Sequence, residues 1–211
     1  MLFAADNFIA EKIIKFAEAK EIEIYLIDIK KHKSSKLAEE YGDHYYTYQS
    51  LEFEELQQII KRFSEKNIKF DYLIFNYYFD ELRTEKMEFL FKSWDDLLEE
   101  WILNSYLIFK NVYPFLNKKE KSRVIYFNSA RGYTGDNCPS FGGDFIEAGL
   151  SGALTGVMTS IAREIIPEGI SVNSIALADD YLDKWPKIEW VLNLWLSGMA
   201  EYSCAESVTI R

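Results

Sequence analysis

The chain alternates between short apolar runs and longer stretches in which apolar residues recur every three or four positions. Apolar runs of four to eight residues, rich in β-branched and aromatic side chains, are typical of buried strands. The predicted strands are Leu2–Ala5, Ile22–Ile29, His44–Tyr48, Tyr72–Asn76, Val124–Asn128, Ser171–Ile175 and Ser207–Ile210. The first of these strands is truncated to a short stub.

The longer stretches predict amphipathic helices, because residues three and four apart share one face of a helix. In the first stretch, Ile9, Ile13 and Phe16 follow this spacing. The predicted helices are Asn7–Ala19, Ser34–Tyr41, Leu51–Glu65, Trp94–Leu116, Phe145–Ile166 and Trp190–Gly198. Alternating strands and helices predict a parallel sheet covered on both faces. We therefore expect residues 1–211 to form one three-layer, doubly wound α/β domain.

The composition narrows the possible partners. A length of 211 residues and a hydrophobic fraction of 48% suit one domain with a substantial core. The formal charge of −10 argues against nucleic acid or an anionic membrane as a partner. Two cysteines and two histidines make neither a disulfide framework nor a metal-ligand cluster. No apolar run has membrane length and no signal-type core is present, so together with the few cysteines we expect a cytoplasmic protein. Because the histidines and cysteines form no ligand cluster, we expect no bound metal.

Motifs along the chain match those of a known family. Ser129 follows a predicted strand, Ala162–Glu164 closes the next long helix, and Gly169–Asn173 leads into another strand. Asp71–Asn76 and Trp94–Leu98 precede them with similar patterns. In these features the chain resembles the short-chain dehydrogenases/reductases over essentially its whole length. The resemblance implies a Rossmann-like fold with that family's topology and a relation to NAD(P)-dependent oxidoreductases.

Three of the family's four catalytic positions carry other residues. Counting at the family's spacing places Trp101, Ser129, Glu147 and Ser151 where the family has Asn, Ser, Tyr and Lys. In the family the Tyr exchanges a proton with the substrate, while the Lys lowers its pKa and holds the nicotinamide ribose. A carboxylate at 147 could move a proton, but the hydroxyl at 151 supplies no positive charge. Ser129 matches, although a turn or helix cap also explains it.

The cofactor-binding positions are changed as well. The family pattern Thr-Gly-x-x-x-Gly-x-Gly lets a pyrophosphate approach the backbone at a helix N-terminus, and Ala4, Phe8 and Ala10 occupy its glycine positions. Asp28 stands where the family places a ribose-binding acid, and a strand-end cap is the other interpretation. Asn76 matches one residue of the family's Asn-Asn-Ala-Gly turn. We expect no NAD(P) bound to this chain.

The substrate end is also shortened. Leu177 and Ala178 replace the family's Pro-Gly, and only Asp179–Glu189 separates them from the next predicted helix. A lid that closes over a substrate needs more length than this. Loss of the glycine turn, the catalytic pair and the lid together predicts a pseudoenzyme.

Two predicted helices, Trp94–Leu116 and Phe145–Ile166, match the family most closely, and in the family they commonly pack against a second subunit. The second helix carries small residues, which permit close approach either of a partner backbone or of its own sheet. These residues are Ala148, Gly149, Gly152, Ala153 and Gly156. Trp190 and Trp195 are further interface candidates, with a place in the core as the alternative.

The patterns together predict a non-catalytic subunit that assembles with and stabilises an active NAD(P)-dependent short-chain dehydrogenase. Families of this kind include hydroxyacyl- and ketoacyl-thioester dehydrogenases with one inactive subunit, in which the cofactor belongs to the partner. Self-association as a homodimer or tetramer uses the same helices. Two alternatives stay open: a divergent oxidoreductase, isomerase or dehydratase using Glu147 and Ser129, and a small-molecule sensor. The sensor's groove would lie among Phe8, Phe75, Tyr77 and Tyr78.

Overall fold

The computed structural model describes residues 1–3, 8–29, 35–49, 51–77, 97–118, 122–130, 144–178, 181–197 and 203–210. Within these ranges, seven parallel strands form one sheet in the order β3-β2-β1-β4-β5-β6-β7. The strands are β1 (Leu2–Phe3), β2 (Leu26–Ile29), β3 (Tyr45–Tyr48), β4 (Tyr72–Asn76), β5 (Arg123–Ser129), β6 (Ser171–Leu177) and β7 (Ser207–Ile210). The first six follow the order of a doubly wound nucleotide-binding sheet. The predicted fold class is confirmed.

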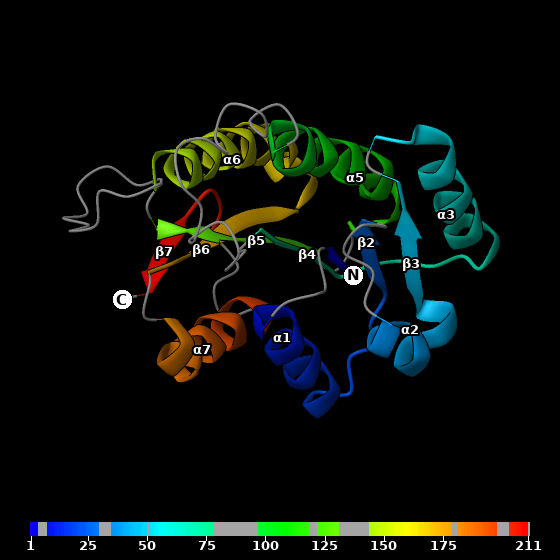
Figure 1. Cartoon of the computed structure of the whole chain (residues 1–211), viewed down its shortest axis with the longest axis horizontal. Helices are drawn as coiled ribbons and strands as arrows, with labels where there is room; N and C mark the ends of the chain where they lie inside the picture. Colours follow the sequence, from blue (N-terminus) through cyan, green and yellow to red (C-terminus); the bar gives the residue numbers. More distant parts are fainter. Residues whose placement is uncertain are drawn as a thin grey trace.

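Helices cover both faces of this sheet (Figure 1). The α-helices are α1 (Phe8–Ala19), α2 (Ser35–Tyr41), α3 (Phe53–Glu65), α5 (Asn104–Val112), α6 (Asp144–Ile165) and α7 (Trp185–Leu196). One apolar core joins the sheet to α3, α5 and α6, and a second joins its other face to α1, α2 and α7. None of the described helices combines the length and the apolar character needed to cross a bilayer.

The second strand is shorter than predicted. It begins at Leu26 rather than Ile22, because both neighbouring strands begin opposite that point: Leu26 pairs with Leu2 of β1 and with Tyr45 of β3. An apolar run upstream of Leu26 has no strand beside it to pair with. The length of an apolar run therefore does not predict how many of its residues pair with neighbouring strands.

The last helix starts earlier than predicted, which shortens the lid segment further. A 3-10 turn, η8 (Tyr181–Lys184), leads directly into α7 at Trp185, so Trp185–Glu189 is helical. Pro186 stands in the first turn of α7, where a missing backbone N–H breaks no hydrogen bond. The prediction of Trp190 as the first residue was therefore wrong.

Candidate functional site

Ligands of doubly wound sheets bind at the carboxyl ends of the strands. In this chain β4 ends at Asn76, β5 at Ser129 and β6 at Leu177, so the family's catalytic and cofactor positions converge on this edge. Ala4, Tyr78 and Asp179 lie outside the described residues. The remaining predicted site residues can each be placed.

The first turn of α1 carries side chains where the family has glycines. Phe8 is the first residue of the helix and half-buried, with the ammonium of Lys12 5.3 Å from its ring centre. Ala10 is completely buried. A phenyl ring and a buried methyl group at this turn do not suit the close backbone approach that a pyrophosphate requires.

Asp28 and Asn76 are the remaining matches to the family's cofactor positions, and both are buried. The hydroxyl of Tyr45, the first residue of β3, donates to Asp28 Oδ2 of β2 at 3.4 Å. The turn after Asp28, which a strand-end cap would contact, lies outside the described residues.

Aromatic rings fill the sheet face beneath α5 and α6 near this edge. Phe75 stacks on Tyr126 with ring centres 4.5 Å apart and on Tyr77 at 5.9 Å, and Tyr77 lies 6.0 Å from Trp101. All four side chains are buried to 99% or more. Phe75 and Tyr77 are thus core residues, and neither exposes surface on which a bound ligand could rest. Of the other residues of the predicted sensor groove, Phe8 is half-buried and Tyr78 lies outside the described residues.

Trp101, at the position of the family's catalytic Asn, lies in a π-helical segment, η4 (Glu99–Leu103), that runs into α5. Asn104 closes this segment: its backbone N–H and its Nδ2 (3.2 Å) both donate to the carbonyl oxygen of Glu99. Its Oδ1 accepts from the Tyr48 hydroxyl at 2.9 Å and from the Leu51 N–H at 3.3 Å. These hydrogen bonds of Asn104 could not be predicted from the sequence, because helical spacing does not distinguish π from α turns.

Ser129, Glu147 and Ser151 lie on adjoining elements, β5 and α6. Asn128 Nδ2 donates to Thr155 Oγ1 at 3.3 Å, which fixes the level at which α6 crosses the strand. At 1.5 Å per residue, Ser151 lies about 6 Å and Glu147 about 12 Å further toward the carboxyl edge. All three predicted residues are buried, Glu147 being 5% exposed. Glu147 also belongs to the first turn of α6, where a carboxylate interacts favourably with the helix dipole.

This set offers a hydroxyl and a carboxylate but no cation at the family's Lys position. The Oγ of Ser151 is buried and has no hydrogen-bond partner, so it neither donates to nor accepts from the candidate catalytic groups. Across the described ranges, no group of three His, Cys, Asp or Glu residues could hold a metal ion. The geometry places Glu147 near the carboxyl edge, and the position of the family's Lys holds the uncharged side chain of Ser151.

The hydroxyl of Tyr126 is a second buried group without a partner. Burial raises the pKa of this phenol far above its ordinary value. Removing an unsatisfied hydroxyl removes its desolvation penalty, so we expect Tyr126→Phe to raise the free energy of unfolding by about 1 kcal/mol. Tyr77→Phe is the matched control, because the Tyr77 hydroxyl lies 2.8 Å from Ser105 Oγ and its loss should destabilise by a similar amount. Urea denaturation of both variants measures this, and a change of the same sign in both would contradict it.

The small residues of α6 face away from the sheet. Gly149, Ala153 and Gly156 are exposed, whereas Ala148 and Gly152 are half-buried. The sheet-facing positions are filled by larger side chains: Leu150, Leu154, Met158, Ile161 and Ile165. The alternative in which the small residues let α6 sit closely on its own sheet therefore does not hold for the three exposed positions.

Trp190 and Trp195 occupy different environments on α7. Trp195 is 2% exposed and packs in the core with Ile188, Val191 and Leu192. Trp190 is 65% exposed and borders an open depression between α7 and the edge strand β7, with Val208 and Ile210 on its other side. Trp195 is thus a core residue, and Trp190 alone of the two can contact a partner.

Comparison with known proteins finds the fold in solved structures. No family model and no curated protein sequence matches the chain. The enoyl-[acyl-carrier-protein] reductase (NADH) of Aquifex aeolicus has a TM-score of 0.79 at 12% identity, covering 99% of this chain and 92% of that one. A short-chain dehydrogenase of Leptospira borgpetersenii with bound NAD+ has 0.76 at 13% identity, covering 99% and 89%. A putative 3-oxoacyl-reductase of Bacillus thuringiensis has 0.73 at 15%, covering 99% and 94%.

These structures match along nearly the full length of the chain, from the central strands to the closing edge strand. At sequence identities this low, the similarity shows a shared fold and does not identify a substrate or a cofactor. The chain has the fold of the short-chain dehydrogenases and reductases.

Proposed function

We propose that this chain is a non-catalytic subunit that assembles with an active NAD(P)-dependent short-chain dehydrogenase through the outer faces of α5 and α6. The changed catalytic positions support the absence of the family's own chemistry, and the side chains at the first turn of α1 support the absence of a bound nicotinamide cofactor. In this assembly the cofactor belongs to the partner. We favour a partner whose substrates are hydroxyacyl or ketoacyl thioesters.

The observation that carries the proposal is Gly156 in the middle of α6. A side chain built at this glycine meets no atom within 4 Å, so packing within the chain does not require a glycine here. Glycine inside a helix costs about 1 kcal/mol relative to alanine. Close approach of a second backbone accounts for retaining it, because any Cβ would then hold the two helices apart.

The neighbouring helix presents apolar surface on the same face of the molecule. Leu103, just before α5, and Tyr106, in its first turn, are each 50% exposed. α6 packs beside this segment, and both helices lie on the outer side of the sheet (Figure 1). Exposed large apolar side chains next to small ones suit a partner helix that packs into the surface.

Affinity capture of this chain from lysate of its own source, analysed by native mass spectrometry, tests the proposal. We expect co-purification of a short-chain dehydrogenase that carries the glycine turn and the Tyr-x-x-x-Lys pair. Removing this chain should leave that enzyme less stable or incorrectly assembled. Recovery of the chain only as itself, or full stability of the enzyme without it, would overturn the heteromeric subunit.

Ala153→Arg places a long charged side chain on the proposed contact surface. We expect at least a tenfold fall in the partner recovered, because a buried unpaired charge and the added volume both oppose close helix packing. Ala19→Arg, at an exposed position at the end of α1, is the matched control and should leave recovery unchanged. Both variants should melt within a few degrees of the parent chain, since neither position is buried.

The alternative, in which this chain is itself an enzyme, is tested by assaying the purified chain for turnover. Turnover by the purified chain alone that Glu147→Gln abolishes would identify a catalyst and contradict the non-catalytic subunit. Glu147 is the carboxylate to change because it is the candidate proton-transfer group at the carboxyl edge.

A further inference from the structure

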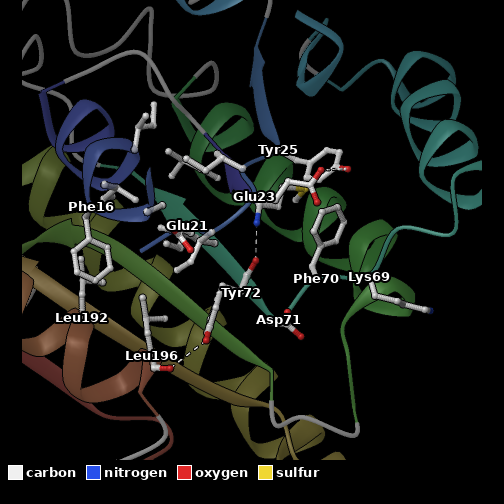
Figure 2. A pocket seen from close by; sticks show the side chains of 18 residues that line it. Phe16, Glu21, Glu23, Tyr25, Lys69, Phe70, Asp71, Tyr72, Leu192 and Leu196 are labelled. Atoms are coloured by element: carbon white, nitrogen blue, oxygen red, sulfur yellow. Dashed lines mark hydrogen bonds between the residues drawn. The ribbon is translucent and has the colours of Figure 1, made fainter. Parts of the chain in front are cut away.

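A pocket opens at the opposite edge of the sheet from the candidate site. It lies where β1, β2 and β4 begin, between the last turns of α1 and the end of α7 (Figure 2). Its volume is about 310 Å³, the lower end of the range of about 300–1,000 Å³ for pockets that hold small molecules. This pocket shares no residue with the family's catalytic or cofactor positions, so an inference about it stands apart from the proposed subunit role.

The inner wall of the pocket is apolar. α1 contributes Ile13 and Phe16, α7 contributes Leu192 and Leu196, and Ile74 of β4 lies between them. Figure 2 shows Phe16 and Leu192 side by side on one wall, with Leu196 below them. A ligand body that fits this wall is therefore aliphatic or aromatic, since a polar body would lose its hydration without gaining hydrogen bonds.

The mouth of the pocket is negatively charged. Glu21, Glu23 and Asp71 contribute carboxylates. Lys69 is the cationic side chain in the lining, and its Nζ is held away by the Pro114 carbonyl at 3.2 Å and the Phe115 ring at 5.7 Å. Figure 2 shows this lysine directed outward from the other labelled side chains.

The Met1 amino group and the His44 imidazole are the other basic groups near these carboxylates. Burial lowers the pKa of the Met1 amino group to about 5, although Asp71 opposes the shift, and this amine donates to the Tyr72 carbonyl at 2.7 Å. His44 lies 3.7 Å from Glu23 and is the other cationic candidate at the rim. The pocket therefore combines an apolar interior with an excess of negative charge at its opening.

Glu21 is held in an unfavourable backbone conformation at this mouth. Its φ of 57° lies in the left-handed region, which costs an ordinary residue about 1–2 kcal/mol and suits glycine. The turn itself is needed, because the N–H of Ile22 and the N–H of Glu21 bond back to Ala17 and Glu18 at the end of α1. A glutamate at a position that glycine would fill more easily adds a carboxylate to the rim.

We propose that this amino-edge pocket binds a small organic cation with an apolar body, an arylalkylammonium ion in chemical class. The apolar part lies against Phe16, Ile74 and Leu196, and the ammonium group lies among the carboxylates of Glu21, Glu23 and Asp71. An anionic ligand of the same shape is excluded by the same charges.

Isothermal titration of the full chain with 4-phenylbutylammonium chloride tests the proposal. We expect saturable binding at one site, at least tenfold weaker binding of 4-phenylbutan-1-ol, and no saturable binding of 4-phenylbutyrate. The alcohol keeps the apolar body and removes only the charge. Equal affinity for the amine and the alcohol, or no saturable binding of the amine, would overturn the proposal.

Variants locate the binding. Glu21→Gln combined with Asp71→Asn should weaken the ammonium ion at least tenfold and leave the alcohol unchanged, because both side chains are exposed and the substitutions keep their shape. Glu11→Gln, an exposed carboxylate at the other end of α1, is the matched control and should change neither ligand. An equal effect of Glu11→Gln would show attraction to the net charge of the molecule and would count against a pocket.

Discussion

Replacing Phe75 by alanine is expected to lower the free energy of unfolding by about 3–5 kcal/mol, the range for removal of a buried phenyl ring. The ring is fully buried in β4 and contacts the rings of Tyr126, Tyr77 and Phe3. Its removal takes away both apolar burial and the stacking on Tyr126 at 4.5 Å. For a chain of this length the loss corresponds to a fall in melting temperature of roughly 6–20 °C.

Chemical denaturation followed by circular dichroism measures this loss, with an unchanged dependence on urea concentration. Phe53→Ala is the matched control, because Phe53 begins α3 and is 51% exposed. That variant should change the stability by about 0.5 kcal/mol or less. A loss below 1 kcal/mol for Phe75→Ala would show that the aromatic layer can collapse and that the stacked rings do not hold this part of the core.

Asn104→Ala should lower the free energy of unfolding by about 2–4 kcal/mol. The substitution removes the acceptor of the Tyr48 hydroxyl and the Leu51 N–H, as well as the side-chain donor to the Glu99 carbonyl. Leaving a buried polar group without its hydrogen bond costs about 1–3 kcal/mol of stability. Partial rearrangement around Asn104 should keep the total cost below the sum of the separate costs. The same change frees the π-helical segment that carries Trp101.

A double-mutant cycle with Tyr48→Phe isolates the main contact. We expect Tyr48→Phe to cost less in the Asn104→Ala background than in the parent chain, by about 1 kcal/mol or more. Asn111→Ala on the same helix is the control, since its contact with Gln57 is exposed and should contribute little. Additive effects of Asn104→Ala and Tyr48→Phe would mean that the amide does not clamp the strand β3 to α5.

The strands β4 and β7 lie where the hydrophobic pattern placed them, because each is a short apolar run flanked by polar residues and paired along its full length. The pattern overestimated β2, since strand length depends on the neighbouring strand as well as on apolar content. The start of α7 was missed, although Pro186 lies in its first turn, a position that favours proline. The stripe Ile188, Val191, Leu192 and Trp195, at helical spacing, contains the information that Trp195 is core and Trp190 is outside.

The candidate site, like the fold, could be predicted from the sequence only in part. Substitutions at the family's positions, such as Glu147 for Tyr, could be recognised by counting residues along the chain. The sequence also contains the information on which face of α6 carries the small residues, because the larger apolar side chains recur at helical spacing on the sheet-facing side: Leu150, Leu154, Met158, Ile161 and Ile165. The amino-edge pocket could not be predicted, since it joins residues from α1, β4 and α7 that no local pattern connects.

β1 contributes two described residues to the centre of the sheet and pairs with β2 on one side and β4 on the other. Among the described residues, β1 forms two residue pairs with each neighbour, fewer than any other pair of adjacent strands forms. The Phe3 side chain compensates, because its ring contacts Tyr48 from one half and Phe75 and Tyr77 from the other. The Phe3 ring thus acts together with the Asn104–Tyr48 hydrogen bond and the packing of Phe63 on Phe70, which also join the two halves. Because these contacts all cross the same boundary, we expect the two halves of the sheet to open as one cooperative unit and not as separate foldons.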